Sequence, residues 1–228
     1  LFLFIICCLS LIIDGYTQDY NEWTGSGDWS NNNNWNTNIY SYGQLEWKGN
    51  GSFTSNNDLN PAFQWRLFFS GNQTYTLTGN LVDLKDFSGQ NSWILSQSSV
   101  NQNIDLDVLF NDQGARSSWI STQGNGGLNF NNISIGGAVT ELRFAGQNTN
   151  GIITVNGDIS GIGKPVVVGR DNNNTLQANT RVEFDGSNTY TGDTRIDAGI
   201  LRLGNAGDLS DDTDVFIASS GTFDLNNQ

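Results

Sequence analysis

The chain has 228 residues, with 23 acidic and 10 basic side chains, so its formal net charge is −13. Nucleic acids and anionic membranes bind through clustered basic side chains, and this balance of charge argues against both as partners. The sequence contains no histidine, which excludes serine–histidine and cysteine–histidine nucleophile systems and histidine-based zinc sites.

The chain begins with an apolar run of 13 residues, LFLFIICCLSLII. This run is too short to span a bilayer and has the length expected of the apolar part of a secretory signal peptide. We place the signal peptide at residues 1–17 with its basic start missing, because the sequence has no methionine. Cys7 and Cys8 would leave with it, although a lipoprotein anchor is an alternative. We therefore expect an exported chain that begins at Gln18 and has no membrane span.

Tryptophan recurs every six residues early in the mature chain, at Trp23, Trp29 and Trp35. We assign residues 18–66 to a tryptophan-rich N-terminal cap or entry segment. Large aromatic side chains with a polar N–H suit either a lid over the open end of a β-structure or a platform on which sugar rings stack. No cluster of polar residues marks a sugar pocket, so we favour the lid and keep these three residues as glycan-stacking candidates.

A sequence frame recurs in the remainder of the chain, residues 67–228. The frame F-x-G-x-x-T-Y-T begins at Phe69 and at Phe184, and shorter copies begin at Phe87 and Phe144. The intervals between successive starts are close to one, three and two multiples of a period of about 19. A short fixed period of this kind predicts a repeat architecture.

Apolar residues between these frames come in pairs separated by one residue. Alternation at period two places both members of a pair on one face of a strand and the intervening polar residue on the other. No run of ten residues has helical spacing, so we expect almost no helix after the leader. The pairs are Leu128/Phe130, Ile133/Ile135, Leu142/Phe144, Ile153/Val155, Val166/Val168, Val182/Phe184, Thr194/Ile196, Leu201/Leu203, Val215/Ile217 and Phe223/Leu225.

A unit this short has no second layer on which to bury its apolar face, so stacking of units must supply the core. Two or three strands per coil, closed by turns rich in Gly and Asn and stacked about 4.8 Å apart, make a parallel β-helix. We therefore predict an all-β fold, a solenoid with about eight coils between Phe69 and Leu225.

The segment from Val182 to Leu225 carries a further pattern, roughly L-x-L-x-G-x-N-T-Y-x-G-x-T-x-I-x-x-G-x-L-x-L-G. The residues that fall on it are Val182, Phe184, Gly186, Asn188, Thr189, Tyr190, Gly192, Thr194, Ile196, Gly199, Leu201, Leu203 and Gly204. This segment resembles the autotransporter-associated β-strand repeat, and the spacing of Trp23, Trp29 and Trp35 resembles the entry segment that often precedes it. The resemblance implies a right-handed parallel β-helix in the passenger region of a bacterial surface or secreted protein associated with the outer membrane.

Carboxylates are the remaining hard ligands and acid or base groups. Asp105 and Asp107 flank Leu106 on the outward face of a predicted strand, where Asp83 or Asp86 could join them from a neighbouring coil. A second group crowds one turn, and its members are Asp208, Asp211, Asp212 and Asp214. Either group could bind Ca²⁺ through oxygen atoms, but neither matches a known calcium loop. We favour solvated surfaces for both, and predict no catalytic residue, cofactor or metal site, with calcium as the alternative.

Two functions from different classes remain open. The first is a non-catalytic structural or adhesive passenger that contacts an extracellular surface, matrix or glycan, with a translocator or sorting domain following downstream. The second is a carbohydrate-binding or lyase-like β-helix that uses carboxylates and Ca²⁺. Fold alone cannot separate them, because polysaccharide-cleaving enzymes share the β-helix.

Overall fold

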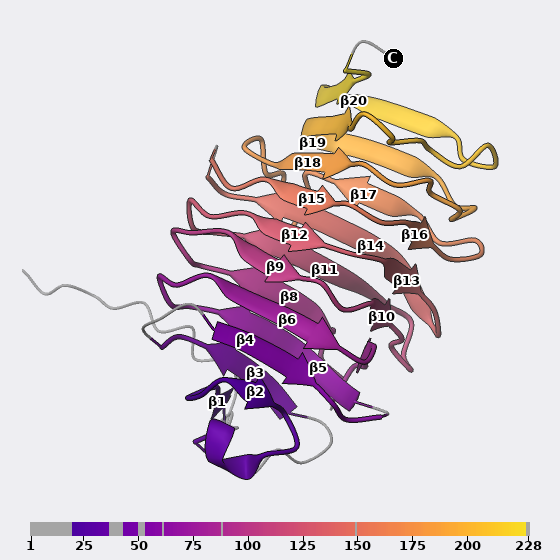
Figure 1. The fold of residues 1–228 in the computed structure, drawn as a ribbon. Helices are drawn as coiled ribbons and strands as arrows, with labels where there is room; N and C mark the ends of the chain where they lie inside the picture. The colour runs from indigo at the N-terminus through magenta and orange to yellow at the C-terminus, as the bar shows by residue number, and fades with distance from the viewer. Residues whose placement is uncertain are drawn as a thin grey trace, which may run out of the picture.

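A computed structural model describes residues 20–36, 43–49, 53–60, 62–87, 89–148 and 150–226. The expected signal peptide, with Cys7 and Cys8, lies outside these residues. The described strands are parallel and wind into a stack of turns, which runs from the N-terminal end at the bottom of Figure 1 to the C-terminal end at the top. Within the described residues the one helical element is the short 3-10 helix η1 (Asn32–Asn34).

The strands of the stack lie on three faces, which we call A, B and C, and among the described residues the first turn and the last turns have no strand on face C. Face A contains β1 (Tyr20–Glu22), β3 (Gly43–Trp47), the second part of β5 (Ala62–Phe69), β8 (Trp93–Ser96), β11 (Arg116–Thr122), β14 (Val139–Gly146), β17 (Val166–Val168), and the first parts of β19 (Thr194–Leu203) and β20 (Val215–Asp224). Face B contains β2 (Gly27–Asp28), β4 (Phe53–Asn57), β6 (Tyr75–Gly79), β9 (Gln102–Ile104), β12 (Leu128–Phe130), β15 (Ile153–Val155), β18 (Arg181–Phe184), and the second parts of β19 and β20. Face C contains the first part of β5, β7 (Val82–Leu84), β10 (Val108–Phe110), β13 (Ile133–Ile135) and β16 (Ile159–Ser160).

This pairing confirms the predicted parallel β-solenoid, which has about eight turns. Two of the turns are built from residues 20–69, because β1, β3 and β5 pair in face A with the same parallel register as later strands. The boundary expected near residue 66 therefore does not coincide with a break in strand pairing. Between Phe69 and Leu225 the stack advances by six turns, fewer than the eight expected.

The short fixed period predicted from the frame is wrong. In face A, Val166 pairs with Thr194, whereas Thr194 pairs with Val215, so the length of a turn exceeds the prediction and varies along the stack. The four phenylalanines of the frame do not share one column. Phe69 and Phe144 lie near the ends of strands of face A, Phe184 ends a strand of face B, and Phe87 lies exposed in the turn after β7. At three of the four positions the frame marks a strand followed by a corner, whereas Phe87 lies in a corner itself, and a turn with strands on all three faces has three corners.

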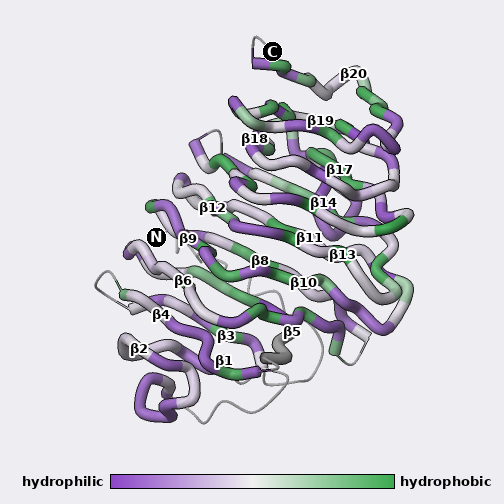
Figure 2. Tube along the Cα trace, turned by 45° about the vertical axis from the view of Figure 1, so that its right-hand side comes forward, coloured by the Kyte–Doolittle hydropathy of each residue, from purple (hydrophilic) through white to green (hydrophobic). Residues whose placement is uncertain are grey.

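The interior is a continuous column of inward-pointing apolar side chains, as the pairs predicted. In face A, Ile94, Ile120, Phe144 and Val168 are stacked in register and fully buried. In face B, Ile104, Phe130, Val155, Phe184 and Leu203 form the matching stack. Burial of each such side chain stabilises the fold by about 1.5–3 kcal/mol relative to exposure. Figure 2 shows the apolar residues recurring from turn to turn along the strands.

The N-terminal end of the interior is filled by four tryptophans, Trp23, Trp29, Trp35 and Trp47, all buried. The ring centroids of Trp23 and Trp35 lie 4.7 Å apart, and those of Trp29 and Trp47 lie 6.0 Å apart. Residues 34–36 run antiparallel to residues 22–24, because the Asn36 N–H donates to the Glu22 carbonyl and the Thr24 N–H to the Asn34 carbonyl. This short segment covers the backbone edge of the first turn at the end of β1.

The C-terminal end is built differently. Among the described residues β20 pairs with β19 on one side and with no strand on the other. Val215 and Ile217 are exposed, Ile217 to 53 %, although in the strand register they continue columns that are buried elsewhere, and Leu225, which follows β20, is exposed as well. The pair Val215/Ile217 therefore points inward from a final rung that nothing covers within the described part of the chain.

Candidate functional site

Outward carboxylates connect one turn to the next, but Asp105 and Asp107 lie in the corner between β9 and β10 and not on a strand as predicted. The Asp107 Oδ1 accepts hydrogen bonds from the side-chain amides of Asn131 (2.9 Å) and Asn132 (3.0 Å), which belong to the following turn. Asp83 contacts Lys85 (3.2 Å) and accepts a hydrogen bond from the Asn111 amide at 3.3 Å. Asp86 accepts hydrogen bonds from the Gln113 and Gly114 backbone N–H groups and contacts Arg116.

The calcium candidates do not converge in the structure. Asp105 is exposed beside the engaged Asp107, and Asp211, Asp212 and Asp214 lie exposed along the turn before β20. No group of three or more acidic, His or Cys side chains in the described ranges is arranged to hold a metal ion.

Replacement of Asp107 by asparagine tests whether its hydrogen bonds to the next turn stabilise the fold. We expect the free energy of unfolding to fall by about 1 kcal/mol, because two hydrogen bonds to a charged acceptor are weakened. The matched control is Asp105→Asn, two residues away and exposed, which should change stability by less than about 0.5 kcal/mol. Urea denaturation followed by circular dichroism, with and without a calcium chelator, measures both. Equal losses in the two variants would contradict the role.

The candidate glycan-stacking residues Trp23, Trp29 and Trp35 all lie in the tryptophan cluster of the core. The Trp29 Nε1–H donates to the Ser55 hydroxyl (2.7 Å), and the Trp35 Nε1–H donates to the Trp29 carbonyl (3.1 Å). Their ring faces contact one another in the interior, so this arrangement presents no exposed ring face of these three residues to a sugar.

Sequence reasoning missed an aromatic stack on the outer side of face A. The rings of Trp93 and Trp119 are nearly parallel, with centroids 5.2 Å apart, and the Arg66 guanidinium lies 4.8 Å from the Trp93 ring centroid. Trp93 and Trp119 are direct partners in the register of β8 and β11. The triplet Ser-Trp-Ile occurs at both positions, and this repetition was the signal that could have revealed the column.

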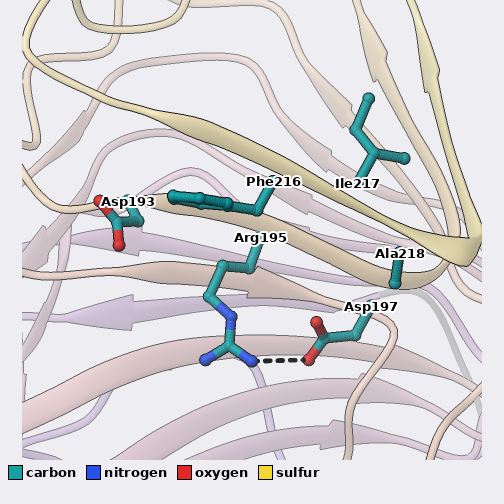
Figure 3. A pocket seen from close by; sticks show the side chains of 6 residues that line it. All are labelled: Asp193, Arg195, Asp197, Phe216, Ile217 and Ala218. Carbon is teal, nitrogen blue, oxygen red and sulfur yellow. Dashed lines mark hydrogen bonds and ion pairs between the residues drawn. The ribbon is translucent and has the colours of Figure 1, made fainter.

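A groove lies further along face A, where β19 and β20 meet. It has a volume of about 510 Å³, opens to solvent, and is lined by Asp193, Arg195, Asp197, Phe216, Ile217 and Ala218. Figure 3 shows the Phe216 ring extending toward Asp193, and Arg195 turned toward Asp197. Arg195 and Phe216 are direct partners in the register of the two strands.

Three arginines contact two carboxylates beside the groove, at different distances. Arg143 contacts Glu141 at 2.5 Å, and Arg170 contacts Asp197 at 2.6 Å. Arg195 reaches the same two carboxylates at longer distances, 3.9 Å to Glu141 and 3.4 Å to Asp197, and its side chain is 42 % exposed. Each carboxylate therefore has an arginine closer to it than Arg195.

A buried carboxyl occupies the corner between faces C and A. Asp112 is fully buried, and its Oδ2 accepts a hydrogen bond from the Ser118 hydroxyl (2.9 Å), which lies 3.0 Å from the Ser92 hydroxyl. Burial raises the pKa of the Asp112 carboxyl above its ordinary value of 3.8, and the hydrogen bonds from the two serines partly oppose the shift.

This raised pKa has a consequence for stability. Below pH 3.8 the carboxyl is neutral in the folded and unfolded chain, so burial costs no charge. As the pH rises through the folded-state pKa, the penalty of a buried charge appears and stability falls. Asp112→Asn keeps the shape and stays neutral, so we expect it to be more stable than the parent chain at pH 7 and to lose this advantage below pH 3.8. Urea denaturation of both proteins across this range checks the prediction, and a pH-independent difference would contradict it.

The strand register and the buried columns define the chain as a parallel β-solenoid protein. Comparisons with protein-family models, with curated proteins and with solved structures found no match in any of the three. In the described part of the chain no helix has the length and apolarity needed to cross a membrane.

Proposed function

We propose that this chain is a non-catalytic structural and adhesive segment of a bacterial cell-surface or secreted protein, exported by its N-terminal leader. One observation carries the proposal, namely the use of outward carboxylates and amides as connectors between turns. Asp107, with Asn131 and Asn132, is the clearest case. Side chains that hold successive turns together contribute to a stable rod, which can present a surface at a distance from the cell.

The acidic character of the chain supports the same role. A net charge of −13 favours solubility and keeps copies apart in solution, which suits a protein that works outside the cell. The resemblance of residues 182–225 to the autotransporter-associated repeat adds the expectation of an outer-membrane location, with an extracellular surface, matrix or glycan as partner.

Incubation with polysaccharides separates this proposal from a carbohydrate-cleaving function. The purified chain without residues 1–17 should release no product from neutral or acidic polysaccharides, with or without calcium. Reducing ends and ultraviolet absorbance of unsaturated products measure hydrolysis and elimination respectively. Product formation that disappears in Asp107→Ala would overturn the proposal in favour of the lyase-like alternative.

A further inference from the structure

Two rows of short polar side chains run along the outer side of face B, over the successive strands β4, β6, β9, β12 and β15. Figure 1 shows these strands side by side on the near side of the stack. In the first row the strand register aligns Thr54, Thr76, Asn103, Asn129 and Thr154. The second row lies two residues further along each strand and contains Asn56, Thr78, Asp105, Asn131 and Asn156.

The second row continues past the ends of three strands. Asp105, Asn131 and Asn156 directly follow β9, β12 and β15, and all three are exposed. Their backbone N–H groups donate to carbonyls of the preceding turn at 2.8, 3.0 and 2.9 Å, so the parallel register extends through these positions. The two rows together form a polar array with two positions in each of five turns.

Hydrogen bonds between neighbours hold part of this polar array in place. In the first row the Asn129 amide donates to the Asn103 Oδ1 at 2.9 Å, and the Asn103 amide donates to the Thr76 hydroxyl at 3.5 Å. In the second row the Thr78 hydroxyl donates to the Asn56 Oδ1 at 3.4 Å. Side chains that are already ordered lose less conformational entropy when a ligand binds.

The polar array is almost free of charge, although the chain has a net charge of −13. Asp105 is the one charged member. The uncharged stretch of the first row ends at β18, where Glu183 follows Thr154 in the register and is itself followed by Arg202. A surface of this kind complements a neutral partner rather than an ionic one.

The size and composition of the polar array argue against two common kinds of partner. With strands about 4.8 Å apart it covers roughly 300 Å², whereas each partner in a stable protein complex buries about 800 Å². The array also has no aromatic residue on which a sugar ring could stack. A partner that is itself a neutral, regular lattice of hydrogen-bonding groups fits it better.

We propose that this polar array binds the surface of ice. Each water molecule in ice donates and accepts hydrogen bonds at fixed positions, and threonine hydroxyls and asparagine amides also do both. The array repeats about every 4.8 Å along the stack, close to the interval between oxygen atoms along a prism face of ice. Ice is an extended solid, so a small patch on each of many copies can hold its growing surface. The proposal goes beyond the structural and adhesive role and does not depend on it.

Inhibition of ice recrystallisation tests the proposal. In a frozen sucrose solution the purified chain should keep ice crystals small at concentrations at which serum albumin does not. Thr76→Tyr places a ring within the first row and should raise the required concentration about tenfold, because the ring separates the array from a flat surface. Thr154→Tyr, at the end of the same row, should raise it as well. Urea denaturation followed by circular dichroism shows that each variant is folded.

Thr140→Tyr is the matched control. Thr140 is also an exposed threonine of a strand, but it lies in β14 on face A, so the required concentration should not change. Asp105→Asn removes the one charge from the array and should lower the required concentration. Absence of inhibition by the parent chain, or equal effects of Thr76→Tyr and Thr140→Tyr, would overturn the proposal and leave the structural and adhesive role standing.

Discussion

Replacement of Trp47 by alanine is expected to lower the free energy of unfolding by about 4 kcal/mol, because it removes the largest class of side chain from a closed part of the core. Trp47 is fully buried, its ring stacks on Phe69 with centroids 5.1 Å apart, and its Nε1–H donates to the Ser55 hydroxyl at 3.3 Å. It also contacts Trp29 and Trp35, so its loss removes a ring against which these two tryptophans pack.

The loss should be local at first, because each turn of a solenoid contacts only its neighbours. Native-state hydrogen exchange should therefore show lost protection for the amides of β1, β3 and β4, and retained protection for β14 and β17. The control is Trp93→Ala, which removes a partly exposed ring from the outer stack and should cost about 1–2 kcal/mol. Equal losses in the two variants would mean that the cluster does not close the interior.

Replacement of Gly169 by alanine is expected to cost about 3 kcal/mol or to prevent folding, through two separate effects. Gly169 follows β17 and has a φ of +86°, a left-handed conformation that costs a residue with a side chain about 1–2 kcal/mol. A Cβ atom would lie 2.0 Å from the Ala198 carbonyl oxygen, and this oxygen belongs to the backbone of the next turn. Relief of the overlap requires separation of two turns, which adds about 1–3 kcal/mol.

Gly163→Ala separates the two contributions. Gly163 also has a positive φ, +63°, but no atom lies within 4 Å of the Cβ position. Only the backbone cost applies, so we expect a loss of about 1 kcal/mol in the same thermal or urea unfolding measurement. If the two variants lose the same stability, the close approach of the turns at Gly169 is not a constraint on the fold.

Much of the architecture could be predicted because a buried strand of three residues leaves a clear pattern. In the pairs Val166/Val168 and Ile153/Val155 both members point inward and are fully buried. Period-two alternation follows from strand geometry and does not depend on which turn a strand belongs to. The stacking of such strands then follows from the absence of a second layer.

The length of a turn could not be read from the frame because corners vary independently of strands. Residues 169–180 form a long corner in which Arg170 bridges to Leu176, and this insertion makes the turn from Val166 to Thr194 longer than the turn that follows it. The groove was missed for a related reason. Arg195 and Phe216 become neighbours only through the register of β19 and β20, and no local motif joins residues so far apart in the sequence.

The segment of residues 34–36 has a consequence for self-association. It engages the Glu22 carbonyl and the Thr24 N–H, which would otherwise lie free at the edge of the first turn. A strand from another copy that added to this part of the sheet would have to displace residues 34–36 first. Edge-to-edge pairing of sheets is therefore disfavoured at this place.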